Sequence, residues 1–190
     1  PVNANYTSAL EYGLYSVVKA SHSQIEKQLP CGKFSAINGD CLKQFVQEFG
    51  QKAFSRPLSE DEIGRYMKVY TSLLKDQGAA ESLTAVTEAI LRSPFAIFRT
   101  ELGESGKMGK QRLTPYELAR ALSYALTNNA PDQELLAKAA DGSLAQDEVY
   151  LEQAQRLLAS DGFIKGFTEY ALRWSDDHFG MAALSNCPAP

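Results

Sequence analysis

The chain has 190 residues, of which 44% are hydrophobic and 22% charged, and its formal net charge is −4 with a pI near 5.3. This composition is typical of a folded globular protein and excludes disorder over most of the length. The slightly acidic balance gives no overall electrostatic attraction to nucleic acid, so we expect no nucleic-acid partner.

No apolar run approaches the roughly 20 residues that span a bilayer, and the chain is therefore not expected to be membrane-spanning. Residues 1–6 lack the apolar segment of a signal peptide. Because the sequence does not begin with Met, we expect a mature product or a piece of a longer protein, and the missing signal does not argue for the cytosol.

Apolar residues in the first half recur with the 3.6-residue period of an amphipathic helix. The helices predicted from this period cover about residues 6–29, 42–53, 63–74 and 83–91. They end at Pro30, before Pro57, near Gly78 and at Ser93-Pro94. The best strand candidate is 93–98, and a helix that continues after a kink fits that stretch equally well.

The second half repeats this pattern at about residues 118–126, 135–139, 151–158 and 163–174. The predicted fold is therefore all-α, a helical bundle of about eight helices in one or two packed lobes. The glycine-rich segment 103–111 is the clearest linker. We expect an N-terminal lobe over 1–102, a C-terminal lobe over 112–174 and an irregular tail over 175–190.

Several helix starts carry recognisable capping residues. Ser59 with Glu62 and Thr114 with Glu117 fit the capping box, in which a hydroxyl and a carboxylate each satisfy an unpaired backbone N–H. Arg56 and Arg92 each precede a helix-ending proline, and we expect both to lie at helix C-termini, where a cation meets free carbonyl groups and the helix dipole.

Two of the three cysteines, Cys31 and Cys41, flank a short loop, residues 32–40, between the first two predicted helices. A disulfide that closes a ring of this size would contribute about 2–3 kcal/mol. The alternative is a pair of free thiols in a cytosolic protein. Cys187 is either free or paired with a segment outside this chain.

No catalytic, cofactor-binding or metal-binding residue is predicted. Cys-x-x-Cys-His and zinc-ligand spacings are absent from the sequence, and there are only two histidines. We interpret Asp176-Asp177-His178 as a solvated helix end and His22 as a surface residue. No nucleophile-elbow motif occurs. Residues 103–110 do not fit a phosphate loop either, because five residues separate Gly103 from Gly109-Lys110 where the motif has four.

Aromatic side chains are numerous, with nine Tyr, nine Phe and one Trp. Most fall on the apolar faces of the predicted helices, which indicates core packing. The alternative is a platform for carbohydrate or a cofactor, built from Tyr12, Tyr15 or Trp174.

Four stretches in this order resemble a known family. They are CLKQFVQEFGQKAFSRPL (41–58), SEDEIGRYMKVY (59–70), AILRSPFAIFRTEL (89–102) and LTPYELARALSYALTNNAPDQELLAKAADGSL (113–144). The set resembles planctomycete-type and myxobacterial-type domains of unknown function that accompany c-type cytochrome modules in large exported proteins. Asn128-Asn129 departs from the family pattern, which has Trp and small residues there.

The resemblance implies export to the periplasm or cell surface and no established reaction. It also implies a bridge between Cys31 and Cys41, because a Cys pair precedes the Phe-Gly helix in the family. Because family members continue beyond the equivalent of Trp174, we expect this chain to be one piece of a longer protein or a shortened relative.

The leading hypothesis is a non-catalytic scaffold or interaction module that docks other protein domains, c-type cytochromes among them. One alternative is an accessory subunit or fragment of a redox enzyme whose active site lies elsewhere. The other is a polysaccharide-binding module that uses Trp174 or Tyr12.

Overall fold

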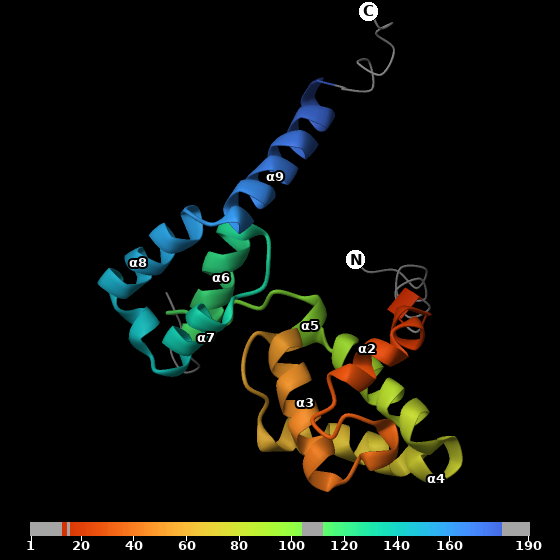
Figure 1. Ribbon diagram of the computed structural model, residues 1–190. Helices are drawn as coiled ribbons and strands as arrows, with labels where there is room; N and C mark the ends of the chain where they lie inside the picture. Colours follow the sequence, from red (N-terminus) through yellow and green to blue (C-terminus); the bar gives the residue numbers. More distant parts are fainter. Residues whose placement is uncertain (1–12, 15, 104–111, 180–190) are drawn as a thin grey trace, which may run out of the picture. The chain divides into compact units, whose positions relative to one another are not determined.

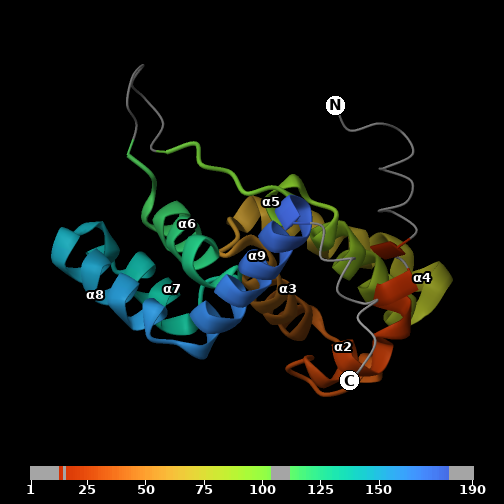
Figure 2. The same cartoon turned by 90° about the horizontal axis from the view of Figure 1, so that it is seen from above.

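The structure, a computed structural model, describes residues 13–14, 16–103 and 112–179, without the side chains of 176–179. None of these residues lies in a β-strand, and helices account for most of them, which confirms the predicted all-α fold. The chain divides into two compact units, Pro1–Thr100 and Glu101–Pro190 (Figures 1 and 2). No helix in the described ranges combines the length and the apolar character needed to cross a membrane.

The first unit is built around two helices that pack against each other, α3 (Gly39–Phe54) and α4 (Glu60–Leu91). The short α2 (His22–Lys27) precedes them and a single 3-10 turn, η1 (Phe34–Ala36), follows α2. After α4 comes the four-residue helix α5 (Pro94–Ile97). The stretch 93–98 is therefore a new helix after a break and not a strand.

Two predicted helices of this unit are joined in α4. The two helical segments adjoin without an intervening loop, but Gly78 has φ 79° and ψ 173°, which breaks the helical geometry between them. Glycine adopts a positive φ without the steric cost of a Cβ. The helix end predicted near Gly78 therefore coincides with the residue at which α4 is kinked. The long first helix, by contrast, is interrupted: residues 16–20 are helical, Ser21 forms a turn, and α2 begins at His22.

The core of the first unit comes from the inward faces of α2, α3 and α4. The apolar side chains with the least exposure, together with Cys41, include Ile25, Leu29, Leu42, Phe45, Val46, Phe54, Ile63, Tyr70, Leu83, Val86 and Ile90. Their spacing in the sequence follows the helical period, as expected for amphipathic helices that bury one face.

The described residues of the second unit form α6 (Pro115–Thr127), α7 (Gln133–Ala140), the 3-10 turn η2 (Ser143–Ala145), α8 (Asp147–Leu158) and α9 (Asp161–Phe179), in this order. Its core is formed by Ala119, Leu122, Leu135, Ala139, Leu144 and Leu157. α9 packs on α6 and, less extensively, on α8, and its far end extends beyond them (Figure 1). Residues 175–179 are helical, so the irregular tail expected from 175 does not begin there, and 180–190 lie outside the described residues.

Both predicted capping boxes are present. The hydroxyl groups of Ser59 and Thr114 accept the backbone N–H of Glu62 and Glu117, whose carboxylates accept the N–H of each cap residue. Asp132 caps α7 through the N–H of Leu135. These local signals determine where the helices begin, because each lies within three residues of the backbone group that it satisfies.

Candidate functional site

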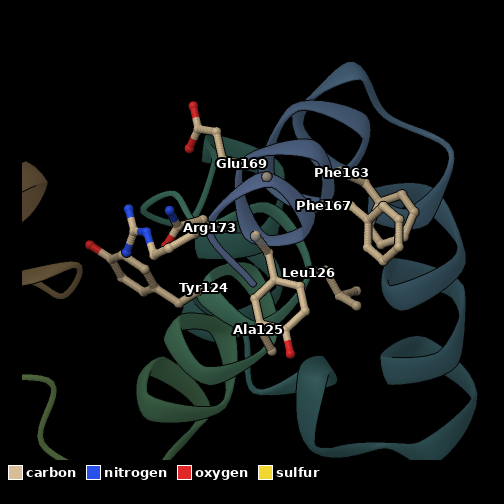
Figure 3. A pocket seen from close by; sticks show the side chains of 10 residues that line it. Tyr124, Ala125, Leu126, Phe163, Phe167, Glu169 and Arg173 are labelled. Atoms are coloured by element: carbon tan, nitrogen blue, oxygen red, sulfur yellow. The ribbon is translucent and has the colours of Figure 1, made fainter. Parts of the chain in front are cut away.

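A pocket of about 390 Å³ lies between α6 and α9. α6 contributes residues from its last turn and its cap, and α9 contributes one face over about three turns. The lining residues are Tyr124, Ala125, Leu126, Asn128, Phe163, Gly166, Phe167, Glu169, Tyr170 and Arg173 (Figure 3). The volume falls within the range of about 300–1,000 Å³ that is usual for small-molecule sites.

The pocket owes its shape to a close approach of two backbones. A Cβ at Gly166 would lie 2.8 Å from the carbonyl oxygen of Thr127, and one at Gly162 would lie 3.4 Å from the Thr127 Cβ. Only glycine at 166 therefore lets α9 lie directly on the end of α6. The large side chains on either side of Gly166 then rise above this contact and form the walls of the pocket.

The two ends of the pocket differ in chemistry. In Figure 3 the rings of Phe163 and Phe167 lie at one end, and the Arg173 guanidinium lies with the Tyr124 hydroxyl at the other. The two phenylalanine rings are stacked, with centroids 5.8 Å apart. The Glu169 carboxylate lies above Arg173 in this view, on the same side of α9.

The polar groups at the Arg173 end are exposed and available. In the ranges that the structure describes, no hydrogen bond or ion pair joins the Arg173 guanidinium, the Tyr124 hydroxyl or the Asn128 side-chain amide to another residue. Asn128 occupies the left-handed region, φ 54°, as the C-cap of α6.

α9 also carries an exposed row of aromatic side chains. Phe163, Phe167, Tyr170 and Trp174 follow one another at intervals of four, three and four residues, which places them along one side of the helix. Phe167, Tyr170 and Trp174 are 58%, 66% and 46% exposed. We call these four residues the aromatic row. The prediction that most aromatics pack in the core therefore does not describe α9.

A second cluster of charge lies where α3 ends and α4 begins. The Arg56 guanidinium donates to both Glu62 carboxylate oxygens, at 2.9 and 2.8 Å, and to the Pro57 carbonyl at 2.9 Å. It also lies over the Phe95 ring, 4.6 Å from its centroid. We expected Arg56 to meet the free carbonyls of the preceding helix. Arg56 does directly follow the C-cap of α3, but its guanidinium bonds to Pro57 and Glu62 instead of to that helix, because Ser55 turns the chain at φ 53°.

The pKa values of Arg56 and Glu62 are both shifted in the direction that favours the charged forms. Hydrogen bonding from Arg56 lowers the pKa of Glu62 to about 2, against the opposing effect of burial. The same bond raises the pKa of Arg56. Both terminal nitrogens of Arg56 and both carboxylate oxygens of Glu62 have partners within the unit, so the cluster has the character of a structural ion pair and not of a reactive site.

Glu117 connects the two sides of the segment 104–113. Its carboxylate accepts the N–H of Leu102 at 2.8 Å and of Gly103 at 3.1 Å, and it also accepts the N–H and hydroxyl of Thr114 at 2.8 and 2.9 Å. Burial alone would raise the pKa of Glu117, but the bonds from Thr114, Leu102 and Gly103 together lower it.

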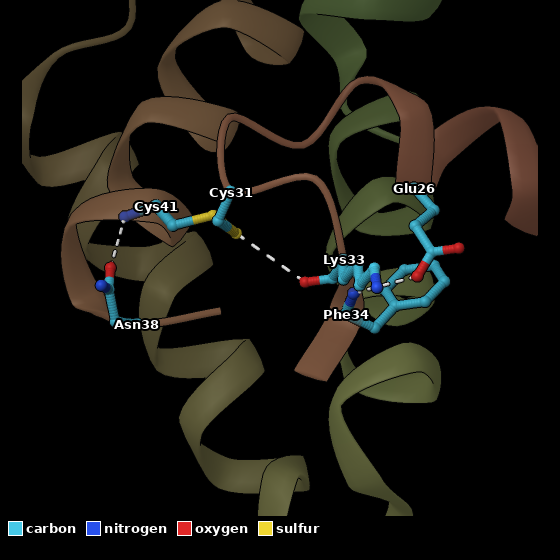
Figure 4. The surroundings of a disulfide bond; sticks show 6 residues. All are labelled: Glu26, Cys31, Lys33, Phe34, Asn38 and Cys41. Atoms are coloured by element: carbon cyan, nitrogen blue, oxygen red, sulfur yellow. Dashed lines mark hydrogen bonds between the residues drawn. A yellow bond between two sulfur atoms is a disulfide. The ribbon is translucent and has the colours of Figure 1, made fainter. Parts of the chain in front are cut away.

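Cys31 and Cys41 form a disulfide, with their Cα atoms 5.9 Å apart (Figure 4). The loop between them has further supports: Asn38 caps α3 by accepting the Cys41 N–H at 2.9 Å, and Glu26 accepts the Phe34 N–H at 3.1 Å. Of the two interpretations of the cysteine pair, the structure contains the disulfide. Its second half-cystine is buried in the core of the first unit.

His22 is not the free surface residue that we expected. It is half-buried, its Nε2 lies 2.6 Å from the hydroxyl of buried Thr84, and its ring meets Phe34 edge-on with centroids 6.1 Å apart. Thr84 lies 62 positions further along the chain. No local pattern could have indicated this contact, because it depends on how α2 packs on α4.

Several other candidate positions fall outside what the structure describes: Tyr12, Tyr15, Cys187, residues 104–110 and the side chains of Asp176, Asp177 and His178. The backbone of Asp176–His178 belongs to α9. Within the described ranges, no group of three or more His, Cys, Asp or Glu side chains is placed to hold a metal ion.

Sequence reasoning missed the pocket, and one signal for it was present. Gly162 and Gly166 are spaced four apart in a helix with aromatic residues on both sides, a pattern that favours close helix approach. The partner backbone at Thr127 could not be identified from the sequence.

Two regions of the chain match family models. Residues 41–101 match the model described as PSD5, protein of unknown function (DUF1595), and residues 113–183 match the one described as PSD4, protein of unknown function (DUF1592). Searches of curated proteins and of solved structures gave no match. The chain therefore contains a DUF1595-type region followed by a DUF1592-type region, which confirms the resemblance to domains of unknown function.

Proposed function

We propose that this chain is a non-catalytic helical interaction module that docks another protein domain outside the cytoplasm. The observation that carries the proposal is the aromatic row on α9, with Phe167, Tyr170 and Trp174 all about half exposed or more. Large aromatic side chains on an exposed helix face are the residue types that dominate binding energy at protein interfaces.

The spacing of the aromatic row favours a helix as the partner element. Intervals of four, three and four residues are those of the seam along which two helices pack. The row begins near the start of α9, a helix that packs on α6 and α8, and continues toward the end of α9, which extends beyond them (Figure 1). A partner helix laid along this side would cover the exposed rings.

The Cys31–Cys41 disulfide supports a location in an oxidising compartment, because such bonds persist in exported proteins and are rare in the cytosol. The periplasm or the cell surface is therefore the proposed location. The family resemblance adds a specific candidate for the partner, a c-type cytochrome module of an exported protein.

Photocrosslinking in the native organism tests the docking role. Tyr170 is replaced by p-benzoylphenylalanine in the full chain, and a matched variant carries the same residue at Leu151, which is 59% exposed on α8 away from the aromatic row. We expect one defined adduct from position 170 and none from 151. A Soret absorption band in the purified adduct would identify the partner as a haem protein.

Equal adducts from both positions, or none from position 170, would contradict docking through α9. Intact mass of the chain isolated from its cell envelope, measured before and after reduction, tests the location separately. A gain of two hydrogen masses upon reduction is expected for one disulfide, and recovery of the chain only from the cytosol in its reduced form would contradict export.

Polysaccharide recognition is a second candidate, because Tyr170 and Trp174 offer exposed rings one turn apart on α9. A glycan array would distinguish it. Binding that is lost in Trp174→Ala but kept in Leu151→Ala supports this role, and no binding across the array counts against it.

A further inference from the structure

We propose that the pocket between α6 and α9 binds a carboxylate that is attached to an aromatic or similarly flat apolar group. The pocket is a concave site of about 390 Å³ with walls on two helices, and it shares Phe163, Phe167 and Tyr170 with the aromatic row, which continues along α9 to Trp174. A partner helix laid along the aromatic row would cover these shared rings, so ligand binding is tested on the isolated chain and its outcome is separate from that of the crosslinking test.

The apolar end of the pocket defines one part of the ligand. Phe163 and Phe167 present stacked rings, and Leu126 and Ala125 close the side toward α6 (Figure 3). A flat apolar group fits this end because it can pack against ring faces and edges while releasing water from them. A neutral sugar would leave its hydroxyl groups without partners there.

The Arg173 end of the pocket defines the charged part of the ligand. Arg173 and Tyr124 direct N–H and O–H donors to the same end of the pocket, and Asn128 adds an amide at the C-cap of α6. These donors have no partner among the described residues. A planar guanidinium matches a carboxylate with two parallel hydrogen bonds, which gives both strength and orientation.

Rigid elements hold both ends in place. The contact of Gly166 with the Thr127 carbonyl fixes the distance between the α6 end and the α9 face, and Arg173 and Phe163 lie on the same helix. A ligand that spans the pocket would therefore meet a preformed site, which lowers the entropic cost of binding. Glu169 also lines the pocket, and its carboxylate would repel an anion bound beside Arg173.

Binding is tested with 3-phenylpropanoate as the probe, titrated into the isotope-labelled full chain and followed by amide chemical shifts. We expect saturable shifts at Tyr124, Asn128 and Gly166. The neutral analogue 3-phenylpropanamide removes the charge, and acetate removes the ring. Each is expected to bind at least about tenfold more weakly, because each loses one end of the contact.

Variants of α9 identify the residue that binds the charge. Arg173→Gln is expected to weaken binding of 3-phenylpropanoate at least about tenfold. Arg173→Lys keeps the charge but not the planar guanidinium, so it should weaken binding less than Arg173→Gln does. The matched control Lys165→Gln removes one positive charge from an exposed position of the same helix and should leave the affinity unchanged. Glu169→Gln should tighten binding. Circular dichroism checks that each variant is folded, as expected for substitutions at exposed positions.

The ligand could be a small molecule or the C-terminal end of a protein chain. A second probe distinguishes them: a tetrapeptide that ends in Phe with a free carboxylate, with the same peptide as its C-terminal amide for comparison. Tighter binding of the free peptide than of 3-phenylpropanoate assigns the site to a protein chain end, and the reverse assigns it to a small molecule. The proposal is overturned if no saturable shift occurs at the pocket amides, if Arg173→Gln and Lys165→Gln act alike, or if only neutral sugars bind there.

Discussion

The Glu62 carboxylate receives both terminal nitrogens of the Arg56 guanidinium, at 2.9 and 2.8 Å, and it also accepts the Ser59 N–H at 2.8 Å. One carboxylate thereby joins the turn after α3 to the first turn of α4. The Glu62 side chain is only 8% exposed. Because α3 and α4 form the core of the first unit, this connection bears directly on the stability of that unit.

Glu62→Gln should destabilise the first unit by about 2–4 kcal/mol, because it leaves the Arg56 charge half-buried without its partner. Urea unfolding followed by circular dichroism measures the loss. The matched control is Glu60→Gln, which removes a pair with Lys43 whose side chains are 76% and 44% exposed. An exposed pair contributes about 0–1 kcal/mol, so a control as destabilised as Glu62→Gln would contradict the assignment.

The same pair predicts a dependence on pH. The folded-state pKa of Glu62 is lowered from 4.5 to about 2, so its contribution is complete above pH 4.5 and is lost as the pH falls toward 2. The difference in unfolding free energy between the parent and Glu62→Gln should therefore shrink across this window and nearly vanish at its lower end. A difference that stays constant between pH 5 and about pH 2 would show that the charge is not involved.

Gly166→Ala should lower the stability of the second unit by about 1–3 kcal/mol, because the new Cβ would lie 2.8 Å from the Thr127 carbonyl oxygen. Gly64→Ala in α4 is the control, since a Cβ there meets nothing within 4 Å. It should stabilise by up to about 1 kcal/mol through helix propensity alone. Thermal unfolding compares the two, and a stabilised Gly166→Ala would contradict the close approach of α9 and α6.

Removal of the Cys31–Cys41 disulfide should destabilise the first unit by about 2–3 kcal/mol. The experiment replaces both residues with Ser in a Cys187→Ser background, so that no free thiol can exchange. Amide exchange of the first unit should accelerate while that of α6–α9 stays unchanged. Unchanged protection of the amide at position 41 and of its neighbours on α3 would mean that the core holds the loop without the bond.

Glu117→Gln should expose the backbone on both sides of the segment 104–113. The carboxylate accepts the N–H groups of Leu102, Gly103 and Thr114, and an amide with one oxygen cannot replace all of these bonds. Hydrogen exchange at Leu102 and Gly103 should be at least about tenfold faster, equivalent to about 1.4 kcal/mol. Asp132→Asn at the α7 cap is the control and should leave exchange at Leu102 unchanged.

Features that depend on residues within one helical turn could be predicted. Ser59 with Glu62 and Thr114 with Glu117 indicated two helix starts, and the residues themselves supply the groups that satisfy the backbone. Gly78 marked the place where α4 changes direction, since it alone in that stretch adopts a positive φ freely. The apolar period gave the core faces of α3, α4 and α6 because burial selects one side of each helix.

The tertiary structure alone decided which distant groups meet. His22 bonds to Thr84 across 62 positions, Arg56 bonds forward to Glu62 after the left-handed turn at Ser55, and Gly166 lies on the Thr127 carbonyl. The sequence by itself determined an all-helical chain with defined helix starts, because periodicity and capping act over a few residues. Packing determined the pocket and the exposed aromatic row, because these depend on where one helix axis lies relative to another.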